Sequence, residues 1–210
     1  MKTKKIFIIR HGQTDYNLKS IVQGKGIDAP LNENGHAQAQ AFYNKYNNEG
    51  FEVVYTSTLK RTTESVQAFI DDGLPQIKLA GLDEISWGVY EGVEAGYEDK
   101  LFFKDITERW AKGETSLAID EGESPDEVAQ RQHEVIEIIK KHEESKVLIC
   151  MHGRALRVFL TQLLDLPIAG MDQFGHSNLC LYLLNYTNGK FTLEKENDIR
   201  HLEKEVIKER

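Results

Sequence analysis

The stretch Ile6-Phe7-Ile8-Ile9-Arg10-His11-Gly12-Gln13-Thr14 decides the fold of this chain. Its four consecutive apolar residues predict a strand that is buried on both pleat faces, as in a parallel or mixed sheet with helices on either side. The strand runs directly into Arg10 and His11. Because ligands of open α/β sheets bind at the carboxyl ends of the strands, we expect these two side chains at the rim of a ligand site.

A second buried strand ends in the same way. Residues 146–151 are almost entirely apolar and are followed by His152 and Gly153, just as the first strand is followed by His11 and a glycine. A glycine after each histidine would let a ligand approach the backbone closely.

A third, shorter strand over residues 53–56 leads into Ser57 and then into a helix that carries Arg61. If the three strands are neighbours, their carboxyl ends converge in one crevice. Two imidazoles and two guanidinium groups would meet there.

Amphipathic segments alternate with these strands. The predicted helices span residues 32–47, 59–70, 125–144 and 155–164, and weaker signals predict a strand at 77–79 and a hairpin at 179–196. The helix start at Ser124-Pro125-Asp126-Glu127 combines an N-cap serine, a proline at the first helical position and a capping box. The sequence therefore predicts an α/β fold, a three-layer sandwich with a mostly parallel central sheet and helices on both faces.

The remaining segments are irregular or charged. Residues 13–31 are polar and rich in turn residues, which predicts a loop at the mouth of the site. Residues 92–123 carry a helical patch without a clear strand, and we expect them to form a lid insertion over the sheet edge. The charged tail at 197–210 is expected to be a frayed helix or disordered.

Composition narrows the class of protein. A length of 210 residues favours one domain over residues 1–210, and a formal net charge of −8 argues against nucleic-acid or membrane-surface partners. No signal peptide or membrane-spanning pattern is apparent, so a cytoplasmic location is expected. Cys150 and Cys180 lie in apolar segments and lack the spacing of a disulfide framework or a zinc site.

The residue types at the predicted crevice suit a dianionic phosphoryl group. The guanidinium groups of Arg10 and Arg61 can match phosphate oxygens bidentately. A neutral imidazole, whose unperturbed pKa is about 6.5, can attack phosphorus, which makes His11 and His152 candidate nucleophiles. A metal site built on Cys150 and His152 is a poor alternative, because further ligands are lacking.

Further residues in the same order carry a resemblance to a known family. They are Arg10-His11-Gly12-Gln13-Thr14 with Asn17, Gln23-Gly24 with Asp28, Pro30 and Leu31, Gly35 with Gln38-Ala39, Ser57, Leu59, Arg61, Leu82-Asp83-Glu84, Gly122-Glu123-Ser124 and His152-Gly153. In this order and spacing, residues 6–186 resemble the histidine phosphatase superfamily, which includes phosphoglycerate mutases.

The resemblance implies a role for each motif residue. His11 would be the nucleophile that forms a phosphohistidine, and Glu84 would protonate the leaving oxygen and then activate water. The residues implied to bind the phosphate or the rest of the substrate are Arg10, Arg61, His152, Asn17, Gln23, Gly24 and Gly153. No metal or other cofactor is implied.

Structural alternatives stay open for several of these residues. Glu84 by itself could be a solvated loop carboxylate, Arg61 could cap a helix or pair with an acid, and Asn17 could only shape a turn. His176 precedes the predicted hairpin together with Asn178 and could reach the pocket, although a structural role is the more frequent one for such a histidine.

One stretch separates hydrolases from mutases within this family. In the glycolytic mutases an arginine follows the acidic glutamate, and a tyrosine two residues further on helps to hold the substrate carboxylate. This chain has Ile85 and Trp87 at those places, and Arg109 is the single arginine between residues 92 and 123. The sequence therefore predicts a metal-independent phosphomonoester hydrolase. The alternatives are a phosphoglycerate mutase-type transfer and a non-catalytic phosphate-binding or partner-binding module.

The expected partner is a small phosphorylated substrate. Residues that could recognise its non-phosphate part, with packing of the insertion as the alternative, are Trp87, Tyr90, Tyr97, Phe102, Phe103, Arg109 and Trp110.

Overall fold

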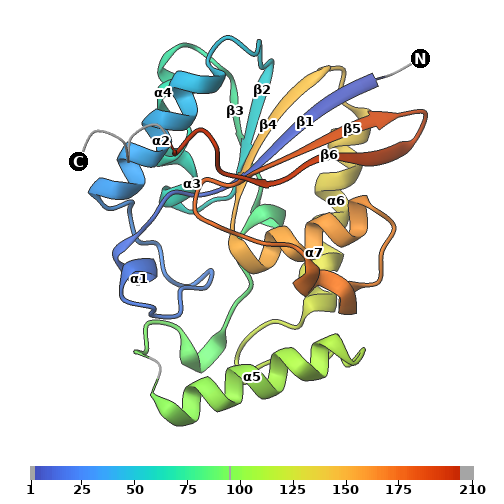
Figure 1. The fold of residues 1–210 in the computed structure, drawn as a ribbon. Helices are drawn as coiled ribbons and strands as arrows, with labels where there is room; N and C mark the ends of the chain where they lie inside the picture. Colours follow the sequence, from blue (N-terminus) through green and yellow to red (C-terminus); the bar gives the residue numbers. More distant parts are fainter. Residues whose placement is uncertain (1–2, 95, 204–210) are drawn as a thin grey trace.

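The computed structural model describes residues 3–94 and 96–203, and its centre is one mixed sheet (Figure 1). The strands, in the order in which they lie side by side, are β3 (Gln76–Lys78), β2 (Val53–Thr56), β4 (Lys146–Met151), β1 (Thr3–Arg10), β5 (Leu181–Thr187) and β6 (Lys190–Asp198). The first four strands in this order are parallel, and β5 and β6 are antiparallel to their neighbours. The α/β fold with a mostly parallel central sheet is confirmed.

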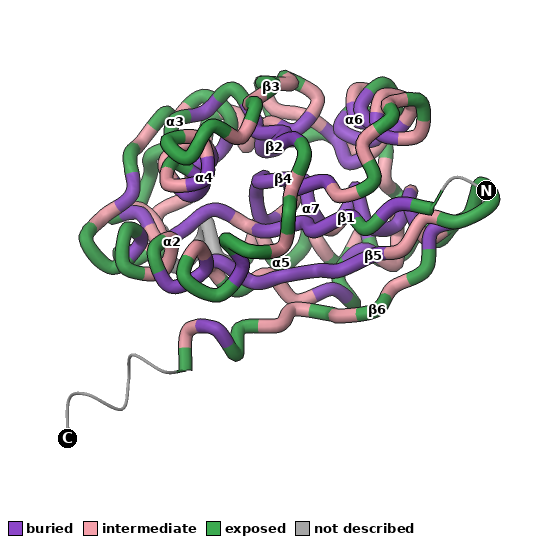
Figure 2. Tube along the Cα trace, turned by 90° about the horizontal axis from the view of Figure 1, so that it is seen from above, coloured by how far each residue is buried: buried purple, intermediate pink, exposed green. Residues whose placement is uncertain are grey.

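Side chains of β1 alternate between two cores. Ile6 and Ile8 belong to the core beneath α6 (Pro125–Lys141) and α7 (Gly153–Leu163), whereas Phe7 and Ile9 belong to the core beneath α2 (Glu33–Tyr46) and α4 (Gln67–Asp71). Figure 2 shows the buried strands running between these two helical layers. The apolar run in the sequence is therefore explained by burial on both faces of the sheet.

The register of β1 against β4 places the two His-Gly motifs side by side. Ile9 pairs with Cys150 and Arg10 with Met151, and the backbone N–H of His11 donates to the Met151 carbonyl at 3.0 Å. Both strands point in the same direction, so both motifs reach the same edge of the sheet.

Close backbone packing fixes the loop after β1. A Cβ atom on Gly12 would lie 2.7 Å from the Gly35 carbonyl oxygen, and one on Gly35 would lie 2.1 Å from the Gln13 carbonyl oxygen. The backbone N–H of Gln13 also donates to Gln38. Because both positions are glycines, the start of α2 can pack directly against the backbone of the loop.

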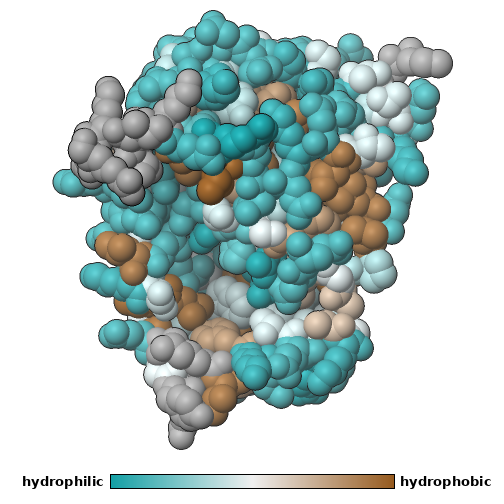
Figure 3. Space-filling view, viewed as in Figure 1, coloured by the Kyte–Doolittle hydropathy of each residue, from teal (hydrophilic) through white to brown (hydrophobic). Residues whose placement is uncertain are grey.

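The insertion contains one long helix, α5 (Tyr97–Ala111), which lies across the end of the molecule to which the carboxyl ends of the parallel strands point (Figure 1). Its inner side is anchored by Trp110, which is fully buried and donates its indole N–H to the Leu117 carbonyl. Figure 3 shows hydrophilic residues along its outer side. The predicted helical insertion is present. The side chain of Tyr97 lies outside the described residues.

The short elements follow from local turn chemistry. They are α1 (Asp15–Leu18), α3 (Lys60–Glu64) and the 3₁₀ turns Ala80–Leu82, Gly88–Tyr90 and Ile168–Gln173. The predicted capping box at Ser124 is present at the start of α6, and α2 begins at the predicted N-cap Asn32. Within the described part of the chain, no helix is long and apolar enough to cross a membrane.

The single helix predicted over residues 59–70 is wrong, because it is broken into α3 and α4. Val66 leaves the helical region, with φ −124° and ψ 12°. The Ser65 hydroxyl donates to the Arg61 carbonyl at 2.6 Å and accepts from the Gly12 N–H at 2.9 Å. A serine that bonds back to its own helix in this way competes with continued helical hydrogen bonding. The break thus ties the Arg61 helix to the loop after β1.

Two predicted boundaries also differ. The helix predicted over residues 125–144 ends at Lys141, because His142 adopts an extended conformation with ψ 159°. The predicted tail at 197–210 begins too early, since β6 continues to Asp198 and the His201 ring is only 8% exposed against Phe42. Residues 204–210 lie outside the described residues.

Candidate active site

A cavity of about 200 Å³ opens where β1 and β4 end. Its lining combines the predicted site with aromatic side chains from the insertion, and it comprises Arg10, His11, Asn17, Val22, Gln23, Glu84, Trp87, Phe103, Gly153, Arg154 and His176. The volume is below the range of drug-sized sites, about 300–1,000 Å³, so the cavity suits a small ligand.

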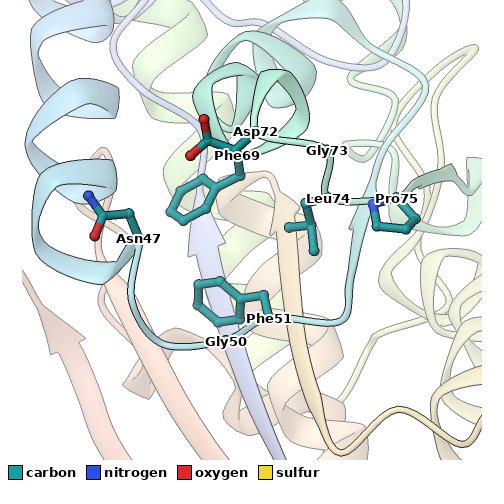
Figure 4. A pocket seen from close by; sticks show the side chains of 8 residues that line it. All are labelled: Asn47, Gly50, Phe51, Phe69, Asp72, Gly73, Leu74 and Pro75. Carbon is teal, nitrogen blue, oxygen red and sulfur yellow. The ribbon is translucent and has the colours of Figure 1, made fainter.

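Larger cavities occur elsewhere but lack comparable chemistry. One of about 260 Å³ lies between Phe51, Phe69 and Leu74, with Asp72 as its charged group (Figure 4). Another, of about 630 Å³, lies beside α2 and His201. The first contains no imidazole or guanidinium. The second contains His201, but its guanidinium, on Arg200, is exposed and paired with Asp198, so size does not identify the functional site here.

His11 is 2% exposed and presents one ring nitrogen for chemistry. Its Nδ1 lies 2.7 Å from the Gly12 carbonyl oxygen, an acceptor, so Nδ1 carries the proton and Nε2 keeps a lone pair. Burial, together with the positive charges of Arg61 and Arg10, holds the pKa of His11 well below its ordinary value. The imidazole is therefore neutral at neutral pH, as a nucleophile must be.

His152 lies next to His11, with the ring centroids 5.1 Å apart, but its nitrogens are both engaged. Nδ1 accepts from Nε of Arg61 at 3.1 Å, and Nε2 therefore carries a proton, which it donates to Oγ of Ser57 at 2.8 Å. Ser57 continues this chain to Thr62 at 2.9 Å. Burial, with Arg61 as the next cause, holds the pKa of His152 well below its ordinary value.

Arg61 is fully buried and does not line the cavity. Besides His152, its guanidinium donates to the carbonyl oxygens of Ile27 at 2.6 Å and Gly24 at 3.2 Å. Burial lowers its pKa to about 10. These contacts join the loop at the mouth of the site to the β4 edge, so the helix-cap alternative for Arg61 is wrong. Direct phosphate binding by Arg61 would require exchange of the two carbonyl contacts.

Of the two predicted arginines, Arg10 is the one that lines the cavity. Its Nη1 donates to the His176 carbonyl at 2.6 Å, while its Nε is buried with no hydrogen-bond partner among the described residues. Burial lowers the pKa of Arg10. A buried unpaired donor is costly, and an anionic ligand oxygen would supply the missing acceptor.

Glu84 is not a solvated carboxylate. It is 7% exposed and lines the cavity, and its two oxygens accept from the backbone N–H groups of Ile85 at 2.9 Å, Ala155 at 2.8 Å and Arg154 at 3.1 Å. Two of these donors belong to the first turn of α7. The helix start therefore fixes the acid on the cavity wall beside His11.

Of the remaining predicted residues, some line the cavity and one contacts a residue behind it. Asn17 and Gln23 line the cavity, and both also hold Thr14, through its backbone N–H and its hydroxyl respectively. Gly153 lines the cavity, where a Cβ atom would lie 2.5 Å from the His176 ring. Gly24 does not line it and instead offers its carbonyl to Arg61.

Two polar residues of the wall were not among the predicted site residues. His176 lines the cavity, and its pKa is lowered to about 3, first by burial and then by Arg10, Arg157 and Arg154. Arg154 directly follows the second His-Gly motif, and its adjacency to that motif was the signal that could have indicated it.

The aromatic residues of the insertion mostly pack, as the alternative interpretation has it. Tyr90 and Phe102 stack at 4.6 Å and line a separate surface cavity together with Arg109, and Trp110 is buried. Trp87 and Phe103 are the exceptions, because they line the site cavity while contacting each other edge to face at 5.4 Å.

In the described part of the chain, no group of three or more His, Cys, Asp or Glu side chains is arranged to hold a metal ion. The fold and the site together define an α/β protein with a cavity at the carboxyl ends of the parallel strands of a mixed sheet, and this cavity combines a neutral imidazole, a buried arginine and a positioned carboxylate.

The family follows from comparison with known proteins. The model of the histidine phosphatase superfamily (branch 1) matches residues 6–199, and the chain belongs to this family. A protein of Yersinia pestis named probable phosphoglycerate mutase GpmB is 29% identical over 215 residues, which cover 97% of each chain.

Solved structures show the same fold. A mycobacterial glucosyl-3-phosphoglycerate phosphatase in complex with VO3 is 25% identical, with a TM-score of 0.81 over 92% of this chain and 98% of that one. A putative alpha-ribazole-5'-P phosphatase from Escherichia coli is 21% identical, with a TM-score of 0.80 over 93% and 97% of the two chains, and shows the fold alone. Family and neighbours together support a phosphatase or mutase.

Proposed function

We propose that the protein is a phosphomonoester hydrolase that acts through a covalent phosphohistidine on His11. Nε2 of His11 attacks the phosphorus atom, and the bond from phosphorus to the ester oxygen breaks as Glu84 gives that oxygen a proton. Water then attacks the phosphorus atom of the phosphohistidine as Glu84 takes a proton from it, the bond from phosphorus to Nε2 of His11 breaks, and inorganic phosphate leaves. The observation that carries the proposal is that His11, whose Nδ1 is engaged by the Gly12 carbonyl so that Nε2 is left as the free nitrogen, lines the same small cavity as Glu84 and Arg10.

Positive charge and hydrogen-bond donors for the transferred group come from the chain itself in this proposal. Arg10 lines the cavity, has no partner for its Nε among the described residues, and donates to a phosphate oxygen in this scheme. A small rotation of the buried His152 ring away from Ser57 would bring its Nε2–H to the same group. Arg61 holds His152 in place. No metal ion is needed in this scheme.

Hydrolysis is favoured over mutase transfer by the residue that follows the acid. Ile85 is fully buried and does not line the cavity, so it cannot hold a substrate carboxylate in the way proposed for the mutases. The 25% identical mycobacterial structure is that of a phosphatase, which points in the same direction. The mutase alternative is favoured by the name of the Yersinia relative.

The test measures both reactions on the same preparation. With ethyl phosphate and p-nitrophenyl phosphate as substrates, in the presence of EDTA and without a bisphosphate, the protein should release inorganic phosphate at a steady rate. Interconversion of 3- and 2-phosphoglycerate with negligible phosphate release would establish the mutase instead, and inactivity with phosphate binding would establish a binding module.

The role of Glu84 is tested by varying the leaving group. Glu84→Gln removes the transferable proton and should lower kcat/KM, which reports the phosphorylation step, by about 10²- to 10⁴-fold on ethyl phosphate. The loss on p-nitrophenyl phosphate should be much smaller, since that leaving group departs without protonation. Asp83→Asn, next in the chain but bonded to Thr58, is the matched control. Equal losses on both esters would remove Glu84 from the acid role.

A further inference from the structure

Arg154 is placed where helix stability does not favour a cation. It is the second residue of α7, and positive charge in the first turn opposes the helix dipole. Its backbone N–H serves Glu84, but that contact needs no particular side chain. The arginine side chain therefore calls for an explanation outside the helix.

The guanidinium of Arg154 reaches the cavity along an aromatic wall. Its carbon lies 5.9 Å from the ring centroid of Trp87 and 5.5 Å from that of Trp110, which is cation–π range. Trp87 and Phe103 line the cavity beside it. These contacts place the guanidinium group against the two indole rings, and Arg154 still lines the cavity.

The charge of Arg154 is only partly neutralised. Its Nη1 binds Oδ1 of Asp172 at 2.5 Å, and Nη1 of Arg157 binds the same oxygen at 2.6 Å. Two guanidinium groups therefore share one carboxylate. Among the described residues, hydrogen bonds from the Arg154 guanidinium go to Asp172 alone, so its other donors are available to a ligand.

The cavity thus holds cations at two places. Arg10 stands beside the nucleophile, and Arg154 stands with Trp87 and Phe103 toward the insertion. His176 lies on the same wall, and its pKa is lowered to about 3, first by burial and then by Arg10, Arg157 and Arg154. A monoester of an uncharged alcohol would leave the second cation without a partner.

We infer that Arg154 is a specificity-determining residue that binds a second anionic group on the substrate, so that the favoured substrates are small phosphomonoesters carrying a carboxylate or a further phosphoryl group. This inference rests on the proposed hydrolase function. It places the anion recognition on α7, away from the position after Glu84, which is occupied by Ile85.

The experiment compares two-carbon phosphomonoesters that differ in charge. For the native protein, kcat/KM on 2-phosphoglycolate should exceed that on ethyl phosphate, while O-phosphoethanolamine, with a cation at that place, should be the poorest substrate. Ethylene glycol bisphosphate distinguishes a phosphoryl group from a carboxylate as the second anion.

Substitutions assign the preference to Arg154. Arg154→Met should lower kcat/KM on 2-phosphoglycolate by about 10- to 100-fold relative to its effect on ethyl phosphate, as for a lost hydrogen bond between charged groups. Arg154→Lys should keep part of the preference, and Arg157→Met, which shares Asp172 but does not line the cavity, is the matched control.

Asp172→Asn should change KM in a direction that a purely structural ion pair between Arg154 and Asp172 does not predict. Removal of the shared carboxylate frees Arg154, so KM for 2-phosphoglycolate should fall while KM for ethyl phosphate stays within about twofold. Hydrolysis of p-nitrophenyl phosphate without any preference for the acidic ester would overturn this inference alone. Absence of phosphate release from every ester would instead overturn the proposed hydrolase. Parallel losses on both two-carbon esters in Arg154→Met and Arg154→Lys would make Arg154 a structural residue.

Discussion

His11 and His152 share one sequence pattern, a buried strand followed by His-Gly, and yet the structure gives the two imidazoles different states. His11 donates through Nδ1 to a backbone carbonyl and keeps a lone pair on Nε2 at the cavity. His152 accepts from Arg61 through Nδ1, carries its proton on Nε2, and does not line the cavity.

The difference arises from the partner of Nδ1. A carbonyl can only accept, which forces the proton onto Nδ1, whereas a guanidinium can only donate, which forces it onto Nε2. One histidine is thereby prepared to attack and the other to donate a hydrogen bond. Parallel motifs in a sequence need not mean equivalent roles.

The largest expected effect on kcat comes from removing the His11 imidazole, whose Nε2 lone pair is the proposed nucleophile. His11→Ala should lower kcat on any monoester by at least about 10⁴-fold, because the covalent route is lost. Rapid quenching of the native protein with p-nitrophenyl phosphate should trap an acid-labile, base-stable phosphoenzyme by mass spectrometry, and the variant should show none. His36→Ala, at an exposed histidine, is the control. A phosphoenzyme on His152 in the variant would reverse the assignment.

A smaller loss of kcat is expected when His152 is replaced. His152→Asn removes the N–H donor that, in the proposed mechanism, moves from Ser57 to the transferred group, and it should lower kcat by about 10²- to 10³-fold. The phosphohistidine should still form on His11, more slowly, which single-turnover labelling can measure. Abolition of labelling in a folded variant would mean that His152 is the nucleophile. His133→Asn, at an exposed position on α6, controls for loss of any histidine.

The hydrogen-bond partner of His152 should matter less again. Ser57→Ala leaves the His152 Nε2 proton without its acceptor, and we expect a free energy of unfolding about 1–3 kcal/mol lower, with kcat reduced less than tenfold. Urea unfolding and steady-state kinetics measure the two effects. Thr62→Ser keeps the hydroxyl chain and should change neither. A loss of kcat as large as that of His152→Asn would show that Ser57 itself acts on the substrate.

The most gradual effect is that of pH on stability. The pKa values of His11, His152 and His176 are all lowered in the folded protein, first by burial. Below about pH 6.5 the unfolded chain binds protons that the folded protein does not, so the free energy of unfolding should fall as the pH drops. The contribution is at most about 1.4 kcal/mol per pH unit for each histidine.

Urea unfolding at pH 7 and pH 5 measures this dependence. His176→Gln removes one of the titrating groups and should show a smaller fall between the two pH values than the native protein. A native stability that is constant or rises toward pH 5 would contradict the assignment of neutral buried histidines.

Much of the fold could be predicted because its signals are local. The burial of all four residues from Ile6 to Ile9, the capping box at Ser124 and the hairpin of β5 and β6 each depend on residues that are close in the chain. The break between α3 and α4 could not be predicted in this way. It depends on the Ser65 hydroxyl meeting the backbone of Gly12, which is 53 residues away in the chain.

The candidate site divides along the same line. The chain showed Arg10 and His11 at the end of a buried strand and Glu84 in a family motif. All three residues line one cavity. The arrival of Arg154 at that cavity was not apparent from the chain, and for His176 the chain left a structural role open beside a place at the pocket, because α7 and the segment before β5 approach the cavity only after the sheet has formed.

The sequence by itself determined the buried strands, the two His-Gly ends and the gathering of cations at one sheet edge, because hydrophobic periodicity and strand direction are encoded residue by residue. The tertiary structure alone decided which ring nitrogen of each histidine carries the proton. It also decided that Arg10, and not Arg61, lines the cavity. Those properties depend on hydrogen-bond partners from distant segments, such as Arg61 for His152 and the His176 carbonyl for Arg10. A side chain's protonation state follows from its neighbours in space, and the register between β1 and β4 sets those neighbours.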